Sequence, residues 1–398
     1  MTDVAAAEAM ILSHIPRLTT ERVALSECVG RVLREDVPAE RPQPPFDRVT
    51  MDGIAIAHRD WTAGVRVFEV LGTQAAGAAQ LRIERPECCV EVMTGAMLPA
   101  GTDTVIPVER LQRAGNAVTV TAAAVERAQF VHPCGSDRSA ASVLLTAGTR
   151  IGAPESAVLA SSGRAQFTVT RLPRAAVIST GDELVEAGEP IAASQIRSSN
   201  DHAIAASLTS QRLAVVTRAL LKDDATALAD AIAELHGRSD LLILSGGVSM
   251  GQFDFVPAVL ESLGAEIVFH RIEQKPGRPM WFGLSSEGKP VFALPGNPVS
   301  TLVCTTRYVL PALRHAAGLP RGPIERVRLT ADAAAPARLT YFLPVALRWS
   351  DDGVALAEPK PTNTSGDFVS LAGTDGFVEL PPGRAVHPAG TVARLFRW

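Results

Sequence analysis

The segment LLILSGGVSMGQFDFVPAVLESLG, from Leu241 to Gly264, combines an apolar run, a glycine-rich loop and a second apolar run. This pattern predicts a strand that ends in a loop and continues into a helix. The alternation recurs, with predicted strands at 175–180, 214–221, 265–272, 279–283 and 290–296 and helices at 200–213, 225–237 and 298–318. Such alternation is typical of a sheet covered by helices on both faces. The sequence therefore predicts an α/β domain with a doubly wound, mostly parallel sheet over residues 173–318.

The rest of the chain has a different texture. Residues 3–16 are predicted to form a helix, with Ala5, Ala9, Ile11, Leu12 and Ile15 on its apolar face. Prolines and short β-like runs follow, which predict a β-rich insert at 43–138. This insert interrupts a segmented domain formed by residues 1–42 and 139–172. Strand-like runs without helical period predict a small β-barrel or sandwich at 319–398.

The composition of the 398 residues argues against several classes of protein. A formal net charge of −4 argues against bulk nucleic-acid binding, and no apolar run approaches the roughly 20 residues that span a bilayer. The five cysteines lack paired CxxC spacing, which indicates neither a disulfide framework nor a zinc cluster. The N-terminus has no basic region typical of a signal peptide. We therefore expect a cytoplasmic protein without nucleic-acid or membrane partners.

Unusual loops follow the predicted strands, where ligands bind in open α/β sheets. STGDEL at 179–184 offers Ser179, Thr180 and Gly181, and then two acids. Asp182 and Glu183 either cap a helix, whose dipole favours acids in its first turn, or face a ligand.

SGGVSMGQFD at 245–254 places three glycines, two serines and one acid in ten residues. A tight turn needs one or two glycines, so Gly246 and Gly247 suggest backbone that lies against a ligand. Ser249 adds a hydroxyl to the same loop. Asp254 either caps the next helix or holds a hydrated Mg²⁺, which takes few carboxylates together with phosphate oxygens.

Two further loops complete the candidate site. KPGRP at 275–279 carries Lys275 and Arg278 on a Pro/Gly-stiffened segment. They form either an ordinary solvated face or a binding site for an oxyanion. LPGNPVS at 294–300 contains Pro295 and places Pro298 at the first position of a helix with Asn297 as its cap. We interpret this stretch as both a turn and a wall of the pocket.

Common catalytic signatures are absent from the sequence. There is no GxxxxGK[ST] loop, no GxSxG elbow and no zinc-ligand spacing. The remaining hydroxyls, carboxylates and cations suit a phosphorylated ligand, with an oxyanion or phosphate moved by positioning and metal assistance.

Seven motifs in this order resemble the molybdopterin molybdenumtransferases, whose eukaryotic relatives include the gephyrin E domain. They are MDG (51–53), MTGAMLP (93–99), STGDEL (179–184), LKDD (221–224), SGGVSMGQFD (245–254), KPGRP (275–279) and LPGNPVS (294–300). The resemblance implies four domains, with an elongated segmented domain and a C-terminal β-barrel. It also implies a homodimer, with a molybdopterin adenylyltransferase and molybdoenzyme chaperones as candidate partners.

The resemblance implies that the substrates are molybdate and adenylylated molybdopterin, and that AMP leaves in a Mg²⁺-dependent step. It assigns catalysis to Asp52, Glu183, Asp223 and Asp254, with Asp254 and Glu183 as metal ligands. The implied substrate-binding residues are Thr94, Asp137, Ser179, Thr180, Gly181, Gly246, Gly247, Ser249, Lys275, Arg278, Pro295, Pro298, Arg338 and Ser365.

The chain departs from the family pattern at three places near the implied site. Arg278 replaces a second lysine, Ser198 replaces an aspartate beside an added Arg197, and Leu343 replaces a basic residue. A guanidinium is planar and an ammonium is not, so these changes put the molybdate site in question. Two other functions remain open: a non-catalytic pterin-binding or scaffolding module, and a molybdopterin adenylyltransferase. The retained acids favour catalysis, and the additional domains argue against an adenylyltransferase.

Overall fold

The computed structural model describes residues 1–247 and 255–398, and the chain divides into two units. The first unit contains Met1–Arg34, Gly148–Gly152 and Gln166–Trp398, and the second contains Glu35–Ala147 and Ala153–Ala165. The finer division into four domains stays a prediction.

A six-stranded sheet forms the centre of the first unit. Its strands, in spatial order, are β16 (Val215–Leu221), β13 (Arg174–Thr180), β17 (Leu241–Ser245), β21 (Pro290–Leu294), β20 (Trp281–Leu284) and β18 (Glu266–His270). The first four run parallel, and β20 and β18 are antiparallel to their neighbours. The predicted mostly parallel sheet is therefore confirmed.

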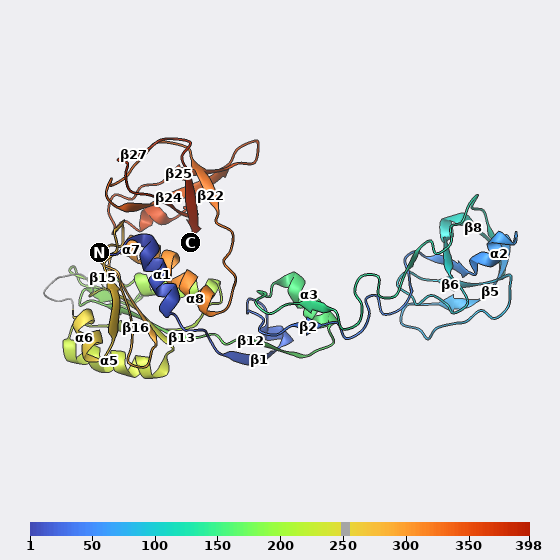
Figure 1. The fold of residues 1–398 in the computed structure, drawn as a ribbon, viewed down its shortest axis with the longest axis horizontal. Helices are drawn as coiled ribbons and strands as arrows, with labels where there is room; N and C mark the ends of the chain where they lie inside the picture. Colours follow the sequence, from blue (N-terminus) through green and yellow to red (C-terminus); the bar gives the residue numbers. More distant parts are fainter. Residues whose placement is uncertain (248–254) are drawn as a thin grey trace. The chain divides into compact units, whose positions relative to one another are not determined.

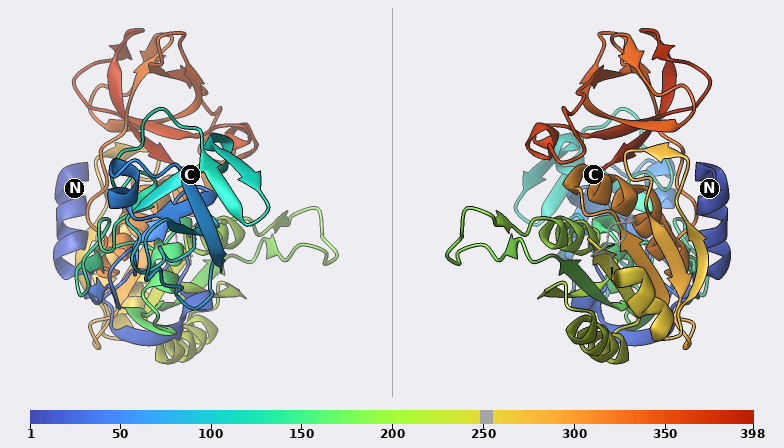
Figure 2. Two further views of the ribbon diagram at one scale, coloured as in Figure 1. Left: turned by 90° about the vertical axis from the view of Figure 1, so that its right-hand side faces the viewer. Right: turned by 90° about the vertical axis from the view of Figure 1, so that its left-hand side faces the viewer.

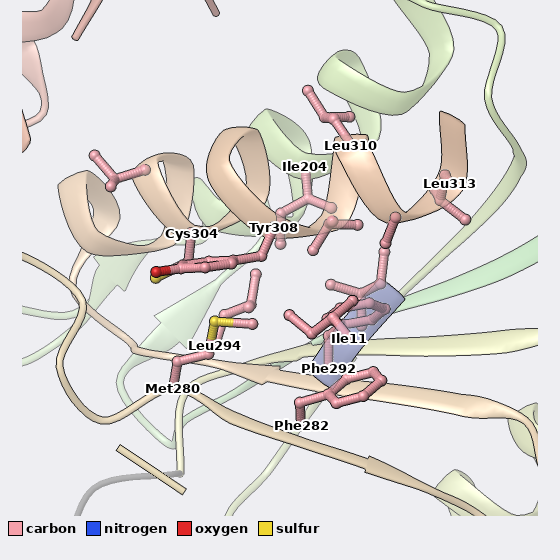
Figure 3. Close-up of a cluster of buried hydrophobic side chains, with 14 of the residues drawn as sticks. Ile11, Ile204, Met280, Phe282, Phe292, Leu294, Cys304, Tyr308, Leu310 and Leu313 are labelled. Atoms are coloured by element: carbon pink, nitrogen blue, oxygen red, sulfur yellow. The ribbon is translucent and has the colours of Figure 1, made fainter. Parts of the chain in front are cut away.

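Helices cover both faces of this sheet because successive strand residues point to opposite sides. Val177 and Ile243 pack into one hydrophobic cluster, and their neighbours Ile178 and Leu244 pack into another. The first cluster contains residues of α1 (Val4–His14), α4 (Asn200–Ser210), α7 (Pro298–Cys304), η3 (Thr305–Val309) and α8 (Leu310–Ala316), and Figure 3 shows part of it. The second contains residues of α5 (Ala225–Arg238) and α6 (Val256–Ser262), which lie together in Figure 1.

The predicted N-terminal helix is confirmed as α1, and its predicted apolar face is correct at Ile11 and Ile15 but wrong at Ala5 and Ala9. Ala5 and Ala9 are exposed, whereas Val4, Ala7 and Ile11 are buried. Alanine buries little area on either side of a helix, so the branched side chains decide which face packs. Asp3 caps the helix by accepting a hydrogen bond from the Ala6 backbone N–H at 2.8 Å.

The C-terminal strands close into the barrel that the family resemblance implies. The ring contains β24 (Thr340–Trp349), β25 (Ala355–Pro359), β22 (Arg326–Leu329), β28 (Val392–Arg397) and β26 (Gly376–Leu380), and pairing of β24 with β26 closes it. The short β23 (Ala333–Ala334), β27 (Val386–His387) and η4 (Val369–Leu371) complete this region. β19 (Gln274–Lys275) pairs in parallel with β24 and so joins a loop of the α/β region to the barrel.

Two smaller features belong to the first unit. β1 (Thr20–Ala24) pairs antiparallel with β12 (Gln166–Thr170), and η1 spans Leu25–Glu27. β14 (Leu184–Val185) and β15 (Ile196–Arg197) pair at the base of an arm, the light-green segment that projects from the rest in Figure 2.

The second unit contains its own six-stranded sheet. In spatial order its strands are β7 (Thr104–Pro107), β4 (Gly53–Ile56), β6 (Cys88–Val92), β5 (Val67–Gln74), β9 (Ala117–Val120) and β8 (Leu111–Ala114). The other elements are β2 (Val37–Pro38), β3 (Arg48–Val49), α2 (His58–Thr62), η2 (Val108–Arg110), β10 (Val131–His132), β11 (Val143–Leu145) and α3 (Ala153–Ser161). Across both units, no helix among the described residues has the length and apolar character needed to cross a bilayer.

Candidate functional site

The carboxyl ends of three neighbouring parallel strands bring several of the predicted residues together. Ser179 on β13 pairs with Ser245 on β17, and Ser245 pairs with Leu294 on β21. The loops that follow these strands therefore start at one edge of the sheet. Ser179 and Thr180 end β13, and the segments that follow the three strands supply Gly181, Gly246, Gly247, Pro295 and Pro298.

The two described glycines of the SGG loop are required by the protein itself. Gly246 and Gly247 have φ angles of +98° and +63°. A Cβ on Gly246 would lie 2.5 Å from the Thr180 carbonyl oxygen, and one on Gly247 would lie 2.8 Å from a Val256 methyl. Backbone conformation and close packing therefore explain both glycines without a ligand beside them.

The acids of STGDEL do not cap a helix, so that alternative is wrong. Strand β14 follows Glu183 directly, and Glu183 is exposed. The Asp182 carboxylate instead accepts a hydrogen bond from the Asp223 backbone N–H at 3.3 Å. This contact is possible because Thr180 pairs with Leu221, so the loops after β13 and β16 are neighbours.

The LKDD motif separates a structural acid from a candidate functional one. Asp224 is the N-cap of α5 and accepts a hydrogen bond from Ala227 N–H at 2.8 Å. Asp223 lies beside Asp182, in the same acidic group as Glu183. Carboxylate oxygens are the ligands that Mg²⁺ prefers, so the donors at this edge fit the magnesium ion that the family resemblance implies.

Buried polar atoms at the same edge lack hydrogen-bond partners among the described residues. They are the Ser179 and Thr180 hydroxyls and the Asn200 Oδ1. A buried polar atom without a partner costs about 1–3 kcal/mol. These three atoms could therefore form hydrogen bonds with a polar ligand at this edge.

Asn200 is a candidate that the sequence analysis missed. Its Nδ2 donates to Ser245 Oγ at 2.8 Å and to the Gly296 carbonyl at 2.7 Å. The side chain thus joins the loops after β17 and β21. Asn200 ends the segment QIRSSN, in which the departures from the family pattern are at Arg197 and Ser198.

The predicted cations lie on an exposed loop. Lys275 and Arg278 are exposed, and Arg278 Nη2 lies 3.0 Å from Met1 Sδ. A Cβ on Gly277 between them would lie 3.7 Å from the Ser300 carbonyl of α7. The loop is therefore close to the helix that follows β21.

A barrel loop reaches the start of the same helix. Pro298 is the first residue of α7 as predicted, but Asn297 makes no side-chain cap bond. Asn297 Nδ2 instead donates to Ser365 Oγ at 2.8 Å, and Val299 N–H donates to the Ser365 carbonyl at 3.0 Å. Arg338 is exposed, two residues before β24 begins beside β19.

The departures from the family pattern have local structural roles. Arg197 donates hydrogen bonds to the backbone carbonyls of Glu186 and Glu189 at 2.8 and 2.6 Å, so its guanidinium links β15 to the segment that follows β14. Ser198 donates to Asp201 Oδ1 at 2.6 Å. Leu343 is buried in the barrel core.

Glu186, Asp201 and His202 offer ligand atoms within 4.8 Å of one another, which is close enough to hold a metal ion. However, Arg218 pairs with Asp201 at 2.5 Å and with Glu186 at 2.9 Å. The guanidinium supplies the cation of this cluster, so the cluster is an ion-pair network.

Three predicted residues lie in the second unit. Asp52 accepts hydrogen bonds from the Thr94 N–H at 2.6 Å and the Thr94 hydroxyl at 2.7 Å. The backbone bond, followed by the hydroxyl bond, lowers the pKa of Asp52 because both stabilise the charged form. Asp137 Oδ1 lies 2.9 Å from His132 Nε2. Ser249 and Asp254 lie outside the described residues.

Comparisons with known proteins cover nearly the whole chain. Residues 2–163 match the model for the MoeA N-terminal region (domain I and II), residues 176–315 match a probable molybdopterin binding domain, and residues 326–395 match the MoeA C-terminal region (domain IV). Crystal structures of the molybdopterin biosynthesis MoeA protein from Pyrococcus horikoshii have TM-scores of 0.83 and 0.82 at 30% and 25% identity. Each comparison covers at least 99% of both chains.

Curated relatives agree with these matches. The molybdopterin molybdenumtransferase of Synechocystis is 40% identical, covering 100% of both chains. The enzyme of the same name from Bacillus subtilis is 31% identical over 94% of this chain and 89% of the relative. Gephyrin from Dictyostelium discoideum is 30% identical over 80% of this chain and 50% of the relative.

Proposed function

The chain belongs to the molybdopterin molybdenumtransferase family, and we propose that it transfers molybdate to adenylylated molybdopterin with magnesium-dependent release of AMP. It is an enzyme of molybdenum cofactor biosynthesis. Beyond this family membership, we propose the individual substrates, the metal and the residues that bind or act on them.

One observation carries the proposal: buried polar atoms without described partners lie beside exposed carboxylates at one sheet edge. Ser179, Thr180 and Asn200 supply the buried atoms, and the acids of STGDEL and LKDD follow the same strands. The hydroxyls and amide suit the polar groups of the pterin and its phosphates. A bound ligand of this kind would satisfy atoms that are otherwise costly to bury.

We assign the acids to metal binding and the cations to molybdate binding. Glu183 and Asp254 would hold Mg²⁺, which when bound would neutralise charge at the phosphoanhydride. Asp223 lies beside Asp182 and adds negative charge at this edge. Lys275 and Arg278 are exposed cations suited to bind molybdate, with Arg338 and Ser365 on neighbouring parts of the barrel.

We also propose a cytoplasmic homodimer in which Asp52 contributes to catalysis and Thr94 and Asp137 bind the substrate. Thr94 fixes one carboxylate oxygen of Asp52 and lowers its pKa, which keeps the acid charged. A charged, oriented carboxylate is suited to position a cationic or hydrogen-bond-donating group of the substrate.

AMP release tests this function directly. Purified protein incubated with adenylylated molybdopterin, Mg²⁺ and molybdate is expected to release AMP, and chelation of Mg²⁺ is expected to stop the release. A scaffolding module would bind the pterin without releasing AMP. A molybdopterin adenylyltransferase would instead release pyrophosphate from ATP and molybdopterin.

The LKDD motif provides a matched pair for the same assay. Asp223→Asn is expected to lower AMP release, whereas Asp224→Asn exchanges one good helix cap for another and is expected to leave AMP release near that of the wild type. Equal activity of the two variants would exclude a specific role for Asp223.

A further inference from the structure

Gln274 precedes the exposed Lys275 but is itself fully buried, with 0% of its surface exposed. Both residues form β19, which pairs with Thr340 and Tyr341 of β24. Successive residues of a strand point to opposite sides, so a buried Gln274 directs Lys275 outward. The orientation of the cation therefore depends on what holds the glutamine.

The Gln274 side chain is held at both ends of its amide. Oε1 accepts a hydrogen bond from the Tyr308 hydroxyl, and Nε2 donates to the Pro276 carbonyl at 3.1 Å and to Cys304 Sγ at 3.5 Å. The Pro276 carbonyl belongs to the residue directly after Lys275. The glutamine thus connects the helical segment 304–308 to the backbone of the loop that carries the cation.

Cys304 adds a second connection to the same loop. Its thiol donates to the Gly277 carbonyl at 3.7 Å. Burial raises the pKa of Cys304 to about 12, so the thiol keeps its proton at neutral pH. Gly277 fits tightly: its φ is +92°, and a Cβ there would lie 2.6 Å from both Cys304 Sγ and Gln274 Nε2.

Phenylalanine would pack at position 308 as tyrosine does, because the two side chains share the same ring. Tyr308 is 2% exposed and lies in the first hydrophobic cluster. Figure 3 shows it beside Cys304, on the helix drawn above Met280 and Leu294. Burying a hydroxyl is unfavourable unless it forms a hydrogen bond. Its hydrogen bond to Gln274 is the feature that distinguishes it from a phenylalanine at this position.

We propose that Tyr308 and Gln274 are positioning residues, which fix the backbone at Pro276 and Gly277 and so orient Lys275 toward a bound oxyanion. This inference rests on the proposed function, because it requires Lys275 to bind molybdate. Neither residue is proposed to touch the substrate.

Tyr308→Phe tests the inference because it removes the hydroxyl and keeps the ring. We expect the KM for molybdate to rise about three- to tenfold, the loss typical of one hydrogen bond, with the KM for adenylylated molybdopterin unchanged. Thr306→Val is the matched control. Thr306 lies in the same helical segment, and its buried hydroxyl has no partner among the described residues. We expect this variant to keep the wild-type KM for molybdate.

A double variant separates this inference from the proposed function. Lys275→Ala is expected to raise the KM for molybdate, and adding Tyr308→Phe is expected to raise it no further. Wild-type KM in Tyr308→Phe, or an equal additional loss in the Lys275→Ala background, would overturn the positioning role alone. An unchanged KM in Lys275→Ala itself would overturn the role of Lys275, and the positioning role with it.

Hydrogen–deuterium exchange gives a readout that does not depend on turnover. The backbone amides of Lys275, Gly277 and Arg278 are expected to exchange faster in Tyr308→Phe than in Thr306→Val. Equal exchange in the two variants would contradict the positioning role.

Discussion

The sheet edge and the loop at 275–278 both carry candidate binding groups, but they are held in place by different means. At the edge, Ser179 and Ser245 are positioned by backbone pairing of neighbouring strands. On the loop, the backbone around Lys275 is fixed by side chains from residues about 30 positions further along the chain. Backbone pairing tolerates substitution of side chains, whereas a side-chain network does not. The loop is therefore the more sensitive of the two regions to distant substitutions.

The largest expected effect concerns Asp254, the acid of the SGGVSMGQFD motif. Asp254→Ala is expected to lower AMP release roughly 100- to 1000-fold while pterin binding stays nearly intact, because charge stabilisation is lost without loss of the ligand's contacts. Single-turnover AMP release and pterin titration measure the two quantities. Full turnover in this variant would remove Asp254 from the mechanism.

A smaller effect is expected at the loop. Lys275→Ala is expected to raise the KM for molybdate about tenfold or more, since a charge-assisted hydrogen bond contributes about 1.5–3 kcal/mol. Steady-state kinetics at varied molybdate measures this. Lys360→Ala is a control for charge, because Lys360 pairs with Glu358 on the barrel at 2.6 Å. If the two variants behave alike, the loop is only a solvated surface.

Asn200 tests whether the sheet edge binds the pterin substrate. Asn200→Ala removes the bridge between Ser245 and Gly296, and we expect the affinity for adenylylated molybdopterin to fall about tenfold. Ser207→Ala, on the same helix, removes a hydrogen bond to the Ala203 carbonyl and serves as the control. Unchanged affinity in Asn200→Ala, measured by titration, would place the pterin elsewhere.

The smallest effect is a change in the titration of Asp52. Thr94→Val removes a hydrogen bond to the charged carboxylate, so the pKa of Asp52 should rise toward its ordinary value. Stability that depends on the ionised acid is present above the unfolded-state pKa and is lost as pH falls through the folded-state pKa. In the variant this contribution to stability should therefore be smaller, and its loss should be complete at a higher pH. Carbon-13 NMR titration of the carboxyl group measures the shift, and an unchanged midpoint would refute the assignment.

The sequence could predict the elements that depend on local pattern. The strands, helices and order of the α/β region were predictable because their apolar runs are separated by clear turn signals. It could not show that β14 follows Glu183, since acids after a turn are also typical of helix caps. Nor could it find Gln274 as a partner of Tyr308, because that contact depends on tertiary packing.

Our central proposal is that the sheet edge binds the phosphates of adenylylated molybdopterin and that the 275–278 loop binds molybdate. A crystal structure with adenylylated molybdopterin and molybdate, analysed by molybdenum anomalous scattering, tests it most directly. We expect the pterin phosphates beside Ser179, Thr180 and Asn200, and the molybdenum peak beside Lys275. Pterin density away from that edge, or a molybdenum peak remote from Lys275, would contradict the account.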